Sequence, residues 1–265
     1  MTNRLSSQGI AALRQGAAEQ VAVEVVAQTG STNADLLARL GSLRQPTLLI
    51  AEEQTAGRGR AGRTWYSAPG ASLTFSLAWR FGLPLRSLVG LPLAVGVAIA
   101  EALATYGVNA QLKWPNDILL EGKKLAGILI ESAVDAHDTA SASWAVVGVG
   151  INLALDGELA ARIGRPAAEV PGLMQTDRDS LMAVLLNKLA QALARFESEG
   201  LAAFIGQWNA LHAYAGQAVC ILDQGRVLHE GLAVGVDETG RFLLETVAGR
   251  IAVMAGDISL RVKED

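Results

Sequence analysis

Apolar residues recur along this chain in two rhythms, one typical of strands and one of helices. Short runs rich in Val, Ile and Leu are typical of strands, and such runs lie at residues 21–28, 47–54, 72–81, 110–114, 117–121, 125–134 and 143–155. Apolar residues three or four positions apart are typical of helices that bury one face. This spacing predicts helices at residues 7–18, 179–199 and 201–211.

Two further helices have more distinctive signatures. Ser31 or Thr32 can cap a helix that carries Leu36, Leu37 and Leu40 on one face. The run at residues 87–107 is almost entirely apolar, but a proline and several glycines interrupt it, and its uncharged part is only about 14 residues long. Because a helix needs about 20 apolar residues to cross a bilayer, we expect a buried helix packed on a sheet, and no membrane association.

The character of the chain changes near Tyr214. From there, short strand-like runs alternate with turn signals at Asp223-Gln224-Gly225, at residues 237–240 and at Ala248-Gly249. About 50 residues with this rhythm predict a small β-barrel. We therefore expect two domains, at residues 1–213 and 214–265.

Composition narrows the class of protein. The net charge of the 265 residues is −4, and no segment is a basic arm or stripe, so we expect no nucleic-acid partner. The one cysteine, Cys220, lies inside the apolar run AVCIL. A disulfide framework within one chain is therefore excluded, and we predict a buried structural thiol and a cytoplasmic location.

The segment EEQTAGRGRAGRTW, residues 52–65, contains three glycines in the spacing G-x-G-x-x-G. In a dinucleotide-binding turn the last glycine opens a helix, but here Pro69-Gly70 and a β-rich run follow. We therefore favour a loop in which Arg58, Arg60 and Arg63 bind a phosphate or carboxylate through their guanidinium groups. A solvated, charged turn is the alternative.

Two more segments carry polar residues in apolar surroundings. In KWPNDILLEGKKLAGILIE, residues 113–131, Lys113 and Asp117 lie among apolar neighbours, where a charge is costly unless it is paired or functional. A structural Lys113–Asp117 pair is one interpretation, and Lys124 can be a simple turn lysine. In VGVGINL, Asn152 ends a hydrophobic strand whose glycines leave room for a neighbour to pack against it.

Together, GSTN (30–33), QTAGRGRAGRTW (54–65), KWPNDILLEGKKLAGILIE and GVGINL (148–153) resemble the biotin protein ligases, also called biotin–[acetyl-CoA-carboxylase] ligases, over essentially the whole chain. The resemblance implies an α/β (α+β) fold: a class II synthetase-like, mixed and mostly antiparallel sheet with helices on one face, followed by a small SH3-like β-barrel. Many bacterial members begin with a DNA-binding domain, whereas only some 20 residues precede the first predicted strand here. The chain thus resembles the monofunctional type.

The family reaction activates biotin with ATP to biotinyl-5′-AMP and then transfers biotin to a lysine of a biotin carboxyl carrier protein. The resemblance implies a biotin site and a nucleotide site. The biotin-binding residues are Ser31, Thr32, Asn33, Gln54, Gly57, Arg58, Gly59, Arg60, Lys124 and Gly127. The residues for ATP and the adenylate are Arg58, Arg60, Arg63, Trp65, Lys113, Asn116, Asp117 and Asn152.

Among these residues the resemblance assigns catalytic roles to Lys124, Arg60 and Asp117, and Asp117 is also the expected contact for Mg²⁺. Helix capping is an alternative role for residues 31–33. Trp65 and Trp114 can wall in the adenylate or serve only in the core.

Two other functions remain open at this stage. A lipoate or octanoyl protein ligase shares the catalytic fold but lacks the GRGR-x-GR loop followed by KWPND. A non-catalytic biotin-binding regulator is the second, although the lysine and the arginines are intact. A homodimer, or carrier docking by strand pairing at VGVGINL, is a further hypothesis.

Overall fold

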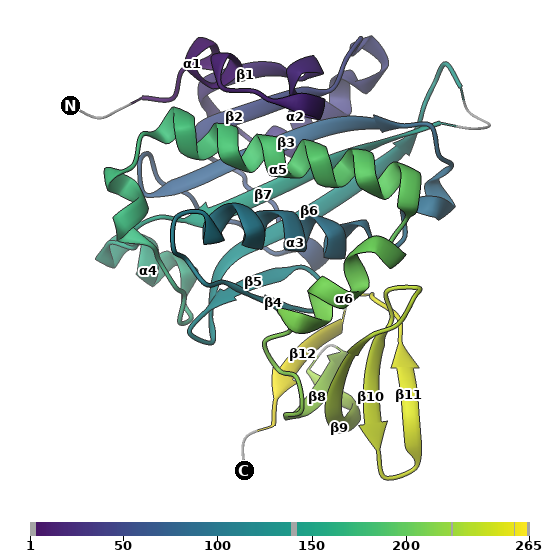
Figure 1. Ribbon diagram of the computed structural model, residues 1–265. Coiled ribbons are helices and arrows are strands. Elements are labelled where there is room, and N and C mark those ends of the chain that lie inside the picture. The colour runs from purple at the N-terminus through teal and green to yellow at the C-terminus, as the bar shows by residue number, and fades with distance from the viewer. Residues whose placement is uncertain (1–3, 139–141, 224, 257, 264–265) are drawn as a thin grey trace.

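A seven-stranded sheet forms the centre of the computed structural model, which describes residues 4–138, 142–223, 225–256 and 258–263 (Figure 1). The strand order is β1-β2-β3-β7-β6-β5-β4. In chain order these strands are β1 (Ala22–Thr29), β2 (Thr47–Gln54), β3 (Ser72–Phe81), β4 (Gln111–Lys113), β5 (Asp117–Leu120), β6 (Lys123–Val134) and β7 (Ser143–Asn152). β1 and β2 run parallel, and the other pairs in this sheet run antiparallel. The predicted mixed, mostly antiparallel sheet is confirmed.

Three helices cover one face of this sheet: α3 (Leu91–Ala104), α5 (Arg178–Glu199) and α6 (Ala202–Ala210). Their apolar faces meet Phe75 of β3 and Val147 of β7 in one large core. The helix predicted at residues 7–18 is divided into α1 (Ser7–Ala12) and a 3₁₀ helix at Gly16–Gln20. The division falls at Gly16, whose φ of +56° is left-handed and ends a regular helix.

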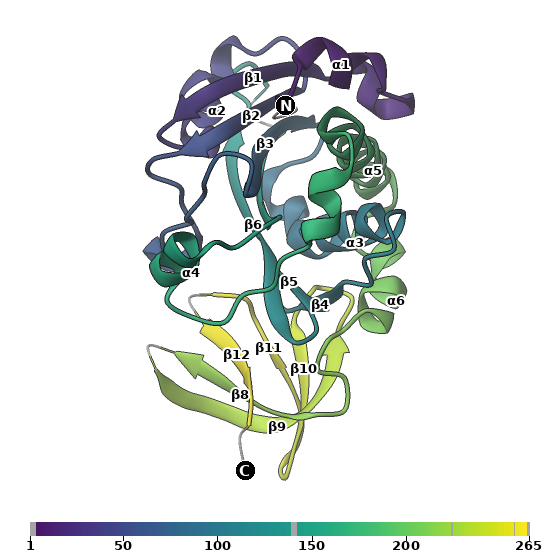
Figure 2. The ribbon, with the colours of Figure 1, turned by 90° about the vertical axis from the view of Figure 1, so that its left-hand side faces the viewer.

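One helix lies on the opposite face, so the expectation that the helices share one face is wrong. Figure 2 shows α2 (Thr32–Arg39) on the other side of the sheet from α3 and α5. Ser31 caps it by accepting from the Ala34 amide, and Leu36 packs with Leu49 and Trp144. β3 and β7 are buried along almost their whole length, so both of their faces need a covering layer.

β7 is a central strand. It pairs with β3 along one edge and with β6 along the other. The hypothesis of homodimer or carrier docking by strand pairing at VGVGINL is therefore wrong, because β7 has no unpaired edge. The strand ends at Asn152, and the short helix α4 (Gly157–Ile163), which the apolar pattern did not predict, follows it.

The C-terminal part forms a separate five-stranded antiparallel sheet in the order β11-β10-β9-β8-β12. Its strands are β8 (Ala218–Asp223), β9 (Arg226–Val236), β10 (Phe242–Thr246), β11 (Gly249–Val253) and β12 (Ile258–Val262). Of the predicted turns, the one at 223–225 includes Gln224, which lies outside the described residues. Cys220 is only half-buried, because its β8 neighbours Val219 and Ile221 are the residues that point into the core. The domain boundary at residue 214 stays a prediction.

Trp114 joins the two parts of the molecule. Its ring lies 5.4 Å from that of Phe242 in β10, and its Nε1 donates to the Gly240 carbonyl at 3.1 Å. With 1% of its surface exposed, Trp114 is a core residue. No described helix combines the length and apolarity needed to cross a membrane.

Candidate functional site

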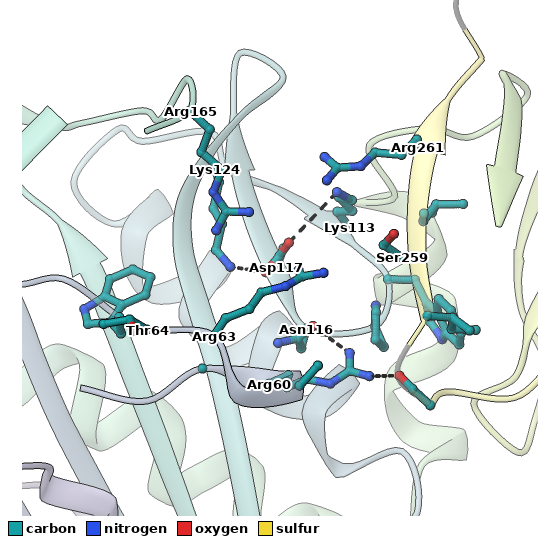
Figure 3. Close-up of a pocket in the computed structure, with 18 residues that line it drawn as sticks. Arg60, Arg63, Thr64, Lys113, Asn116, Asp117, Lys124, Arg165, Ser259 and Arg261 are labelled. Atoms are coloured by element: carbon teal, nitrogen blue, oxygen red, sulfur yellow. Dashed lines mark hydrogen bonds and ion pairs between the residues drawn. The ribbon is translucent and has the colours of Figure 1, made fainter. Parts of the chain in front are cut away.

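Two adjoining cavities lie over the sheet, between the loop at residues 57–65, the strand pair β5–β6 and the C-terminal strand β12. Gly59, Arg60, Trp65, Asn116 and Lys124 line both cavities. We call them the inner pocket, which reaches β3 and α2, and the cationic pocket, which reaches β12. Figure 3 shows the cationic pocket.

The inner pocket ends in a hydrogen-bonded cluster of polar side chains that are buried. Gln54 Oε1 accepts from the Thr32 amide at 2.8 Å and lies 3.0 Å from the Thr32 hydroxyl. The Thr32 and Ser76 hydroxyl oxygens are 2.6 Å apart, and Ser76 donates to Asn33 Oδ1 at 2.6 Å. Ser31 also lines this end. The N-terminus of α2 thus supplies helix caps and pocket residues together, so the two predicted roles are compatible.

The inner pocket changes polarity along its length. Between its two ends the pocket is lined by Trp65, Gly127 and Gly148, which present an indole ring and bare backbone without a charged group. Its other end carries the positive groups of Arg60 and Lys124. The cavity therefore suits a ligand with a polar head, an apolar body and an anionic tail.

Glycines in β7 leave the room that the predicted packing required. A Cβ on Gly148 would lie 2.2 Å from Asn33 Oδ1, and one on Gly150 would lie 2.2 Å from the Trp65 ring. The indole of Trp65 therefore lies directly on β7. Its Nε1 is buried without a hydrogen-bond partner among the described residues.

A β-bulge places Lys124 in the site. Asp117 pairs with Gly127, but Leu119 pairs with Lys124, so β6 carries one extra residue between these pairs. Because side chains alternate along a strand, the extra residue moves Lys124 to the same face as Asp117. Lys124 Nζ donates to the Asp117 carboxylate there and lies 5.9 Å from the Trp65 ring centre.

The cationic pocket has far more positive than negative charge. Its described lining includes six cationic side chains, those of Arg60, Arg63, Lys113, Lys124, Arg165 and Arg261, and one carboxylate, that of Asp117 (Figure 3). Asp117 contacts both lysines, with Lys113 Nζ at 4.0 Å. Among the described residues no carboxylate forms an ion pair with Arg63, Arg165 or Arg261. Such a pocket suits a ligand with several negative charges.

Burial lowers the pKa of Lys113 to about 8, against the opposing effect of Asp117, and the nearby Arg261, Lys124 and Arg165 lower it further. The pair predicted between Lys113 and Asp117 therefore exists, but it lies in the wall of the cavity. The structural and functional interpretations of these two residues are not exclusive.

Arg60 connects the glycine-rich loop to both parts of the molecule. Its Nη1 donates to Asn116 Oδ1 at 2.9 Å, and its Nη2 donates to the Gly256 carbonyl just before β12. Asn116 in turn donates to the Ile128 carbonyl at 2.7 Å. The GRGR segment, the WPND segment and Gly256, which are far apart in sequence, thus meet at one guanidinium group.

The structure brings most of the predicted site residues to these two cavities, and Gly57 and Asn152 lie apart. Gly57 lies behind Trp65, where a Cβ would approach the Trp65 carbonyl to 2.4 Å. Asn152 lines a third cavity behind Trp65 and donates to the Ala168 carbonyl at 3.3 Å. Arg58 lines the mouth of the inner pocket and forms an ion pair with Glu131 at 2.9 Å. Their ligand-binding roles stay predictions.

Several residues of the two cavities were not predicted. Ser76 has a signal in the sequence, because it is a polar residue inside the apolar run SLTFSLAWRF, which is buried on both faces. Glu131, which lies outside the two cavities but accepts from Asn33, likewise has a signal, because it ends the apolar run LAGILIE. Arg165 and Arg261 have no such signal, since each lies in a segment whose charges look like ordinary surface.

The residues present do not form a metal site of their own. Mg²⁺ prefers several oxygen ligands, whereas Asp117 is one carboxylate already paired with two lysines. No group of three metal-binding side chains occurs within the described ranges. The donor set therefore argues against a Mg²⁺ ion held by the protein alone.

Comparison with known proteins gives a consistent relationship. Residues 24–152 match the model of the biotin/lipoate A/B protein ligase family, and residues 214–261 match that of the biotin protein ligase C-terminal domain. The chain is 38% identical to the bifunctional ligase/repressor BirA of Escherichia coli (strain K12), over 91% of this chain and 75% of that protein. It is 35% identical to the biotin–[acetyl-CoA-carboxylase] ligase of Mycobacterium tuberculosis, over 89% of this chain and 88% of that protein.

A solved structure shows the same relationship. The biotin protein ligase from Aquifex aeolicus in complex with biotin and ATP is similar with a TM-score of 0.75 and 30% identity. The similarity covers 91% of this chain and 99% of that one.

Proposed function

The chain belongs to the biotin protein ligase family, and from this premise we propose how its two cavities divide the reaction. It is a biotin–[acetyl-CoA-carboxylase] ligase, which uses ATP to activate biotin and transfers the biotinyl group to a carrier protein. The inner pocket binds biotin, and the cationic pocket binds the phosphates of ATP.

The polarity of the inner pocket is the observation that carries this assignment. Biotin has a urea group at one end, an apolar bicycle and chain in the middle, and a carboxylate at the other end. These parts match the buried cluster of Thr32, Gln54 and Ser76, the uncharged middle, and the positive end at Arg60 and Lys124, in that order. The carboxylate then lies where the two cavities meet.

In the first step a biotin carboxylate oxygen attacks the α-phosphorus of ATP. A bond forms between them, and pyrophosphate leaves with the electrons of the broken P–O bond. Lys124, beside the carboxylate, balances the charge that develops on the α-phosphate. Arg63, Arg165 and Arg261 hold the departing phosphates. Mg²⁺ carried by those phosphates would supply further neutralisation there.

In the second step a lysine amine of the carrier attacks the acyl carbon of biotinyl-5′-AMP. An amide bond forms, and AMP leaves with the electrons of the acyl–oxygen bond. Both nucleophiles belong to substrates, so the protein has to position them, balance charge and exclude water. The residues of the site fit that task. A carrier domain, a homodimer and a cytoplasmic location stay predictions.

A lipoyl or octanoyl substrate fits the inner pocket less well than biotin. Such an acyl chain has no urea group and would leave Thr32, Gln54 and Ser76 without partners. Each unpaired buried polar group costs about 1–3 kcal/mol. A biotin-binding regulator without catalysis would not need Lys124 beside the anionic end.

Biotin-dependent exchange of pyrophosphate into ATP tests the function directly. We expect wild-type exchange with biotin and none with lipoate or octanoate. We expect Lys124→Ala to reduce the exchange rate roughly 100-fold, which corresponds to an activation free energy about 3 kcal/mol higher. The reason is that no lysine then balances the negative charge that develops on the α-phosphate. Its neighbour Lys123 is exposed at the β5–β6 turn, so Lys123→Ala is the matched control and should exchange normally. Equal rates for the two variants would contradict the role given to Lys124.

A further inference from the structure

A chain of hydrogen bonds links Glu131, which does not line the inner pocket, to the polar end of that pocket. Glu131 Oε2 accepts from Asn33 Nδ2 at 2.9 Å. Asn33 Oδ1 accepts from the Ser76 hydroxyl, and the chain continues through Thr32 to Gln54. Glu131 lies on β6 toward the outside of the molecule, where its side chain is 29% exposed.

The carboxylate decides which way round the Asn33 amide lies. Glu131 can only accept, and so can the Leu129 carbonyl, which lies 3.3 Å from the same amide nitrogen. The NH₂ group of Asn33 must face these two acceptors. Its oxygen must then face Ser76, which has one hydroxyl hydrogen and uses it on that oxygen.

The rest of the chain is then one hydrogen short. Three contacts join Asn33, Ser76, Thr32 and the Gln54 oxygen through hydroxyl groups: Ser76 to Asn33, Thr32 to Ser76, and Thr32 to Gln54. Ser76 and Thr32 have only two hydroxyl hydrogens between them. The Gln54 oxygen cannot supply the third, because it already accepts from the Thr32 amide. One of the three contacts therefore has no hydrogen, and an oxygen of that contact can accept one more.

A ligand with N–H groups can supply the missing hydrogen. A urea has two such groups, whereas a fatty-acyl or dithiolane end has none. Without the carboxylate at position 131, only the Leu129 carbonyl, at 3.3 Å, would hold the Asn33 amide in this orientation. A reversed amide would donate to Ser76 and remove the shortage. The Glu131 carboxylate, which lies outside the inner pocket, thus makes the polar end of that pocket an acceptor of hydrogen bonds from N–H groups.

We propose that Glu131 is a positioning residue for recognition of the ureido group. By fixing the orientation of the Asn33 amide, it leaves the polar end of the inner pocket with one hydrogen-bond donor too few, and an N–H group of biotin supplies that donor. This inference rests on the proposed function, because it takes biotin as the ligand. Glu131 also holds Arg58 at 2.9 Å, so an ion pair that merely anchors the loop is the competing explanation.

Steady-state pyrophosphate exchange with Glu131→Met and Glu131→Gln tests the proposal. Methionine keeps the shape and removes the acceptor, so we expect the KM for biotin to rise at least tenfold, with the KM for ATP changed less than twofold. Glutamine can still accept from Asn33 and should restore the KM for biotin to within threefold of wild type. Thermal unfolding of each variant checks that it is folded.

Asn33→Leu separates the two explanations. If Glu131 acts through Asn33, adding Glu131→Met to Asn33→Leu has no further effect on the KM for biotin. If Glu131 acts only by anchoring Arg58, the two effects multiply, and the proposal is wrong.

Biotin analogues methylated at one or the other ureido nitrogen give a second readout. In the wild type we expect methylation of the nitrogen that donates to this end to raise the inhibition constant strongly, and in Glu131→Met that penalty should shrink at least fivefold. Desthiobiotin, which keeps the urea, should follow biotin in both proteins. An unchanged penalty would overturn the proposal. A wild-type protein without biotin-dependent exchange would instead refute the proposed function, before any variant is compared.

Discussion

At the scale of single residues, one carboxylate governs the charge of the nucleotide site. Asp117 contacts both Lys113 and Lys124, while three arginines of the same cavity have no carboxylate partner among the described side chains. The cations that Asp117 does not neutralise attract a polyphosphate. Lys113 is the member of this group whose charge depends on pH within the working range of an enzyme, because its pKa is about 8.

We therefore predict that ATP binds less well at alkaline pH. Below pH 8 Lys113 is protonated and positive, and above pH 8 it becomes neutral in the free enzyme. From pH 7 to pH 9 the KM for ATP should rise about tenfold, the fraction by which the protonated form decreases. Pyrophosphate exchange at a series of pH values measures this.

Lys113→Arg is the control, because arginine keeps its charge throughout this range. The variant should show a flat profile of KM for ATP between pH 7 and pH 9. A profile that rises as in the wild type would mean that another group titrates.

At the scale of elements, the glycines of β7 determine how closely other segments approach the sheet. Trp65 lies on Gly150 and lines both cavities as well as the third one behind it. The strand has no room at that position for even a methyl group.

Gly150→Ala should therefore displace Trp65 and weaken both substrates together. The new Cβ would lie 2.2 Å from the indole, which has to move. We expect the KM values for biotin and for ATP each to rise about tenfold, with a loss of roughly 1–3 kcal/mol in stability from overpacking. Gly41→Ala, where a Cβ would meet nothing within 4 Å, is the matched control. Normal KM values in Gly150→Ala would show that Trp65 is not part of either binding site.

The glycine-rich loop is the second element that we expect to respond to substrates. Residues 57–64 contain three trypsin sites, and Ala61 and Gly62 are exposed. We expect limited trypsin to cut there first, giving fragments of about 6 and 21 kDa in proportion to the chain's 27.7 kDa.

Biotin with ATP and Mg²⁺ should slow this cleavage much more than ATP alone, because the adenylate supplies a phosphate and an apolar chain for the loop to cover. Gel electrophoresis over time measures the effect. Unchanged cleavage in enzyme shown to be active would mean that the loop is already closed without ligand.

At the scale of the whole molecule, a buried histidine lies where the two sheets meet. His212 has 5% of its surface exposed, and its ring lies 5.0 Å from that of Trp208 in α6 and 5.4 Å from that of Phe242 in β10. Neither ring nitrogen has a hydrogen-bond partner among the described residues. This burial lowers the pKa of His212 to about 4.

The protein should therefore lose stability in mild acid. His212 is neutral in the folded state down to about pH 4, but its unfolded-state pKa is 6.5, so protons bind preferentially to the unfolded chain between these values. The free energy of unfolding is not reduced by His212 above pH 6.5, and it decreases as the pH falls below that value. The free energy of unfolding in urea should be about 2 kcal/mol lower at pH 5 than at pH 7 because of this residue.

His212→Phe should remove that part of the pH dependence, because phenylalanine fills the same aromatic cluster and does not titrate. His229→Phe, at an exposed position of β9, is the control and should leave it unchanged. If His212→Phe retains the full loss between pH 7 and pH 5, other groups are responsible.

The elements could be predicted from the apolar pattern, and the list of candidate residues followed from the resemblance of short motifs to a known family. The apolar pattern predicted all seven strands of the large sheet, and of the two predicted caps of α2, Ser31 or Thr32, the structure has Ser31. The glycines of β7 predicted a close neighbour, although not which one. The GRGR and WPND segments resembled the motifs of biotin protein ligases closely enough to indicate biotin and ATP as substrates.

Only the tertiary structure decided which residues face one another. The bulge in β6 turns Lys124 to the side of Asp117, and a bulge depends on the partner strand rather than on the sequence of its own strand. Arg165 and Arg261 line the site beside residues that are distant in the chain, so no local pattern marks them. Helices cover both faces of the sheet because β3 and β7 are central strands. Burial on two sides is a property of the assembled sheet, because strand order, which no single segment encodes, decides it.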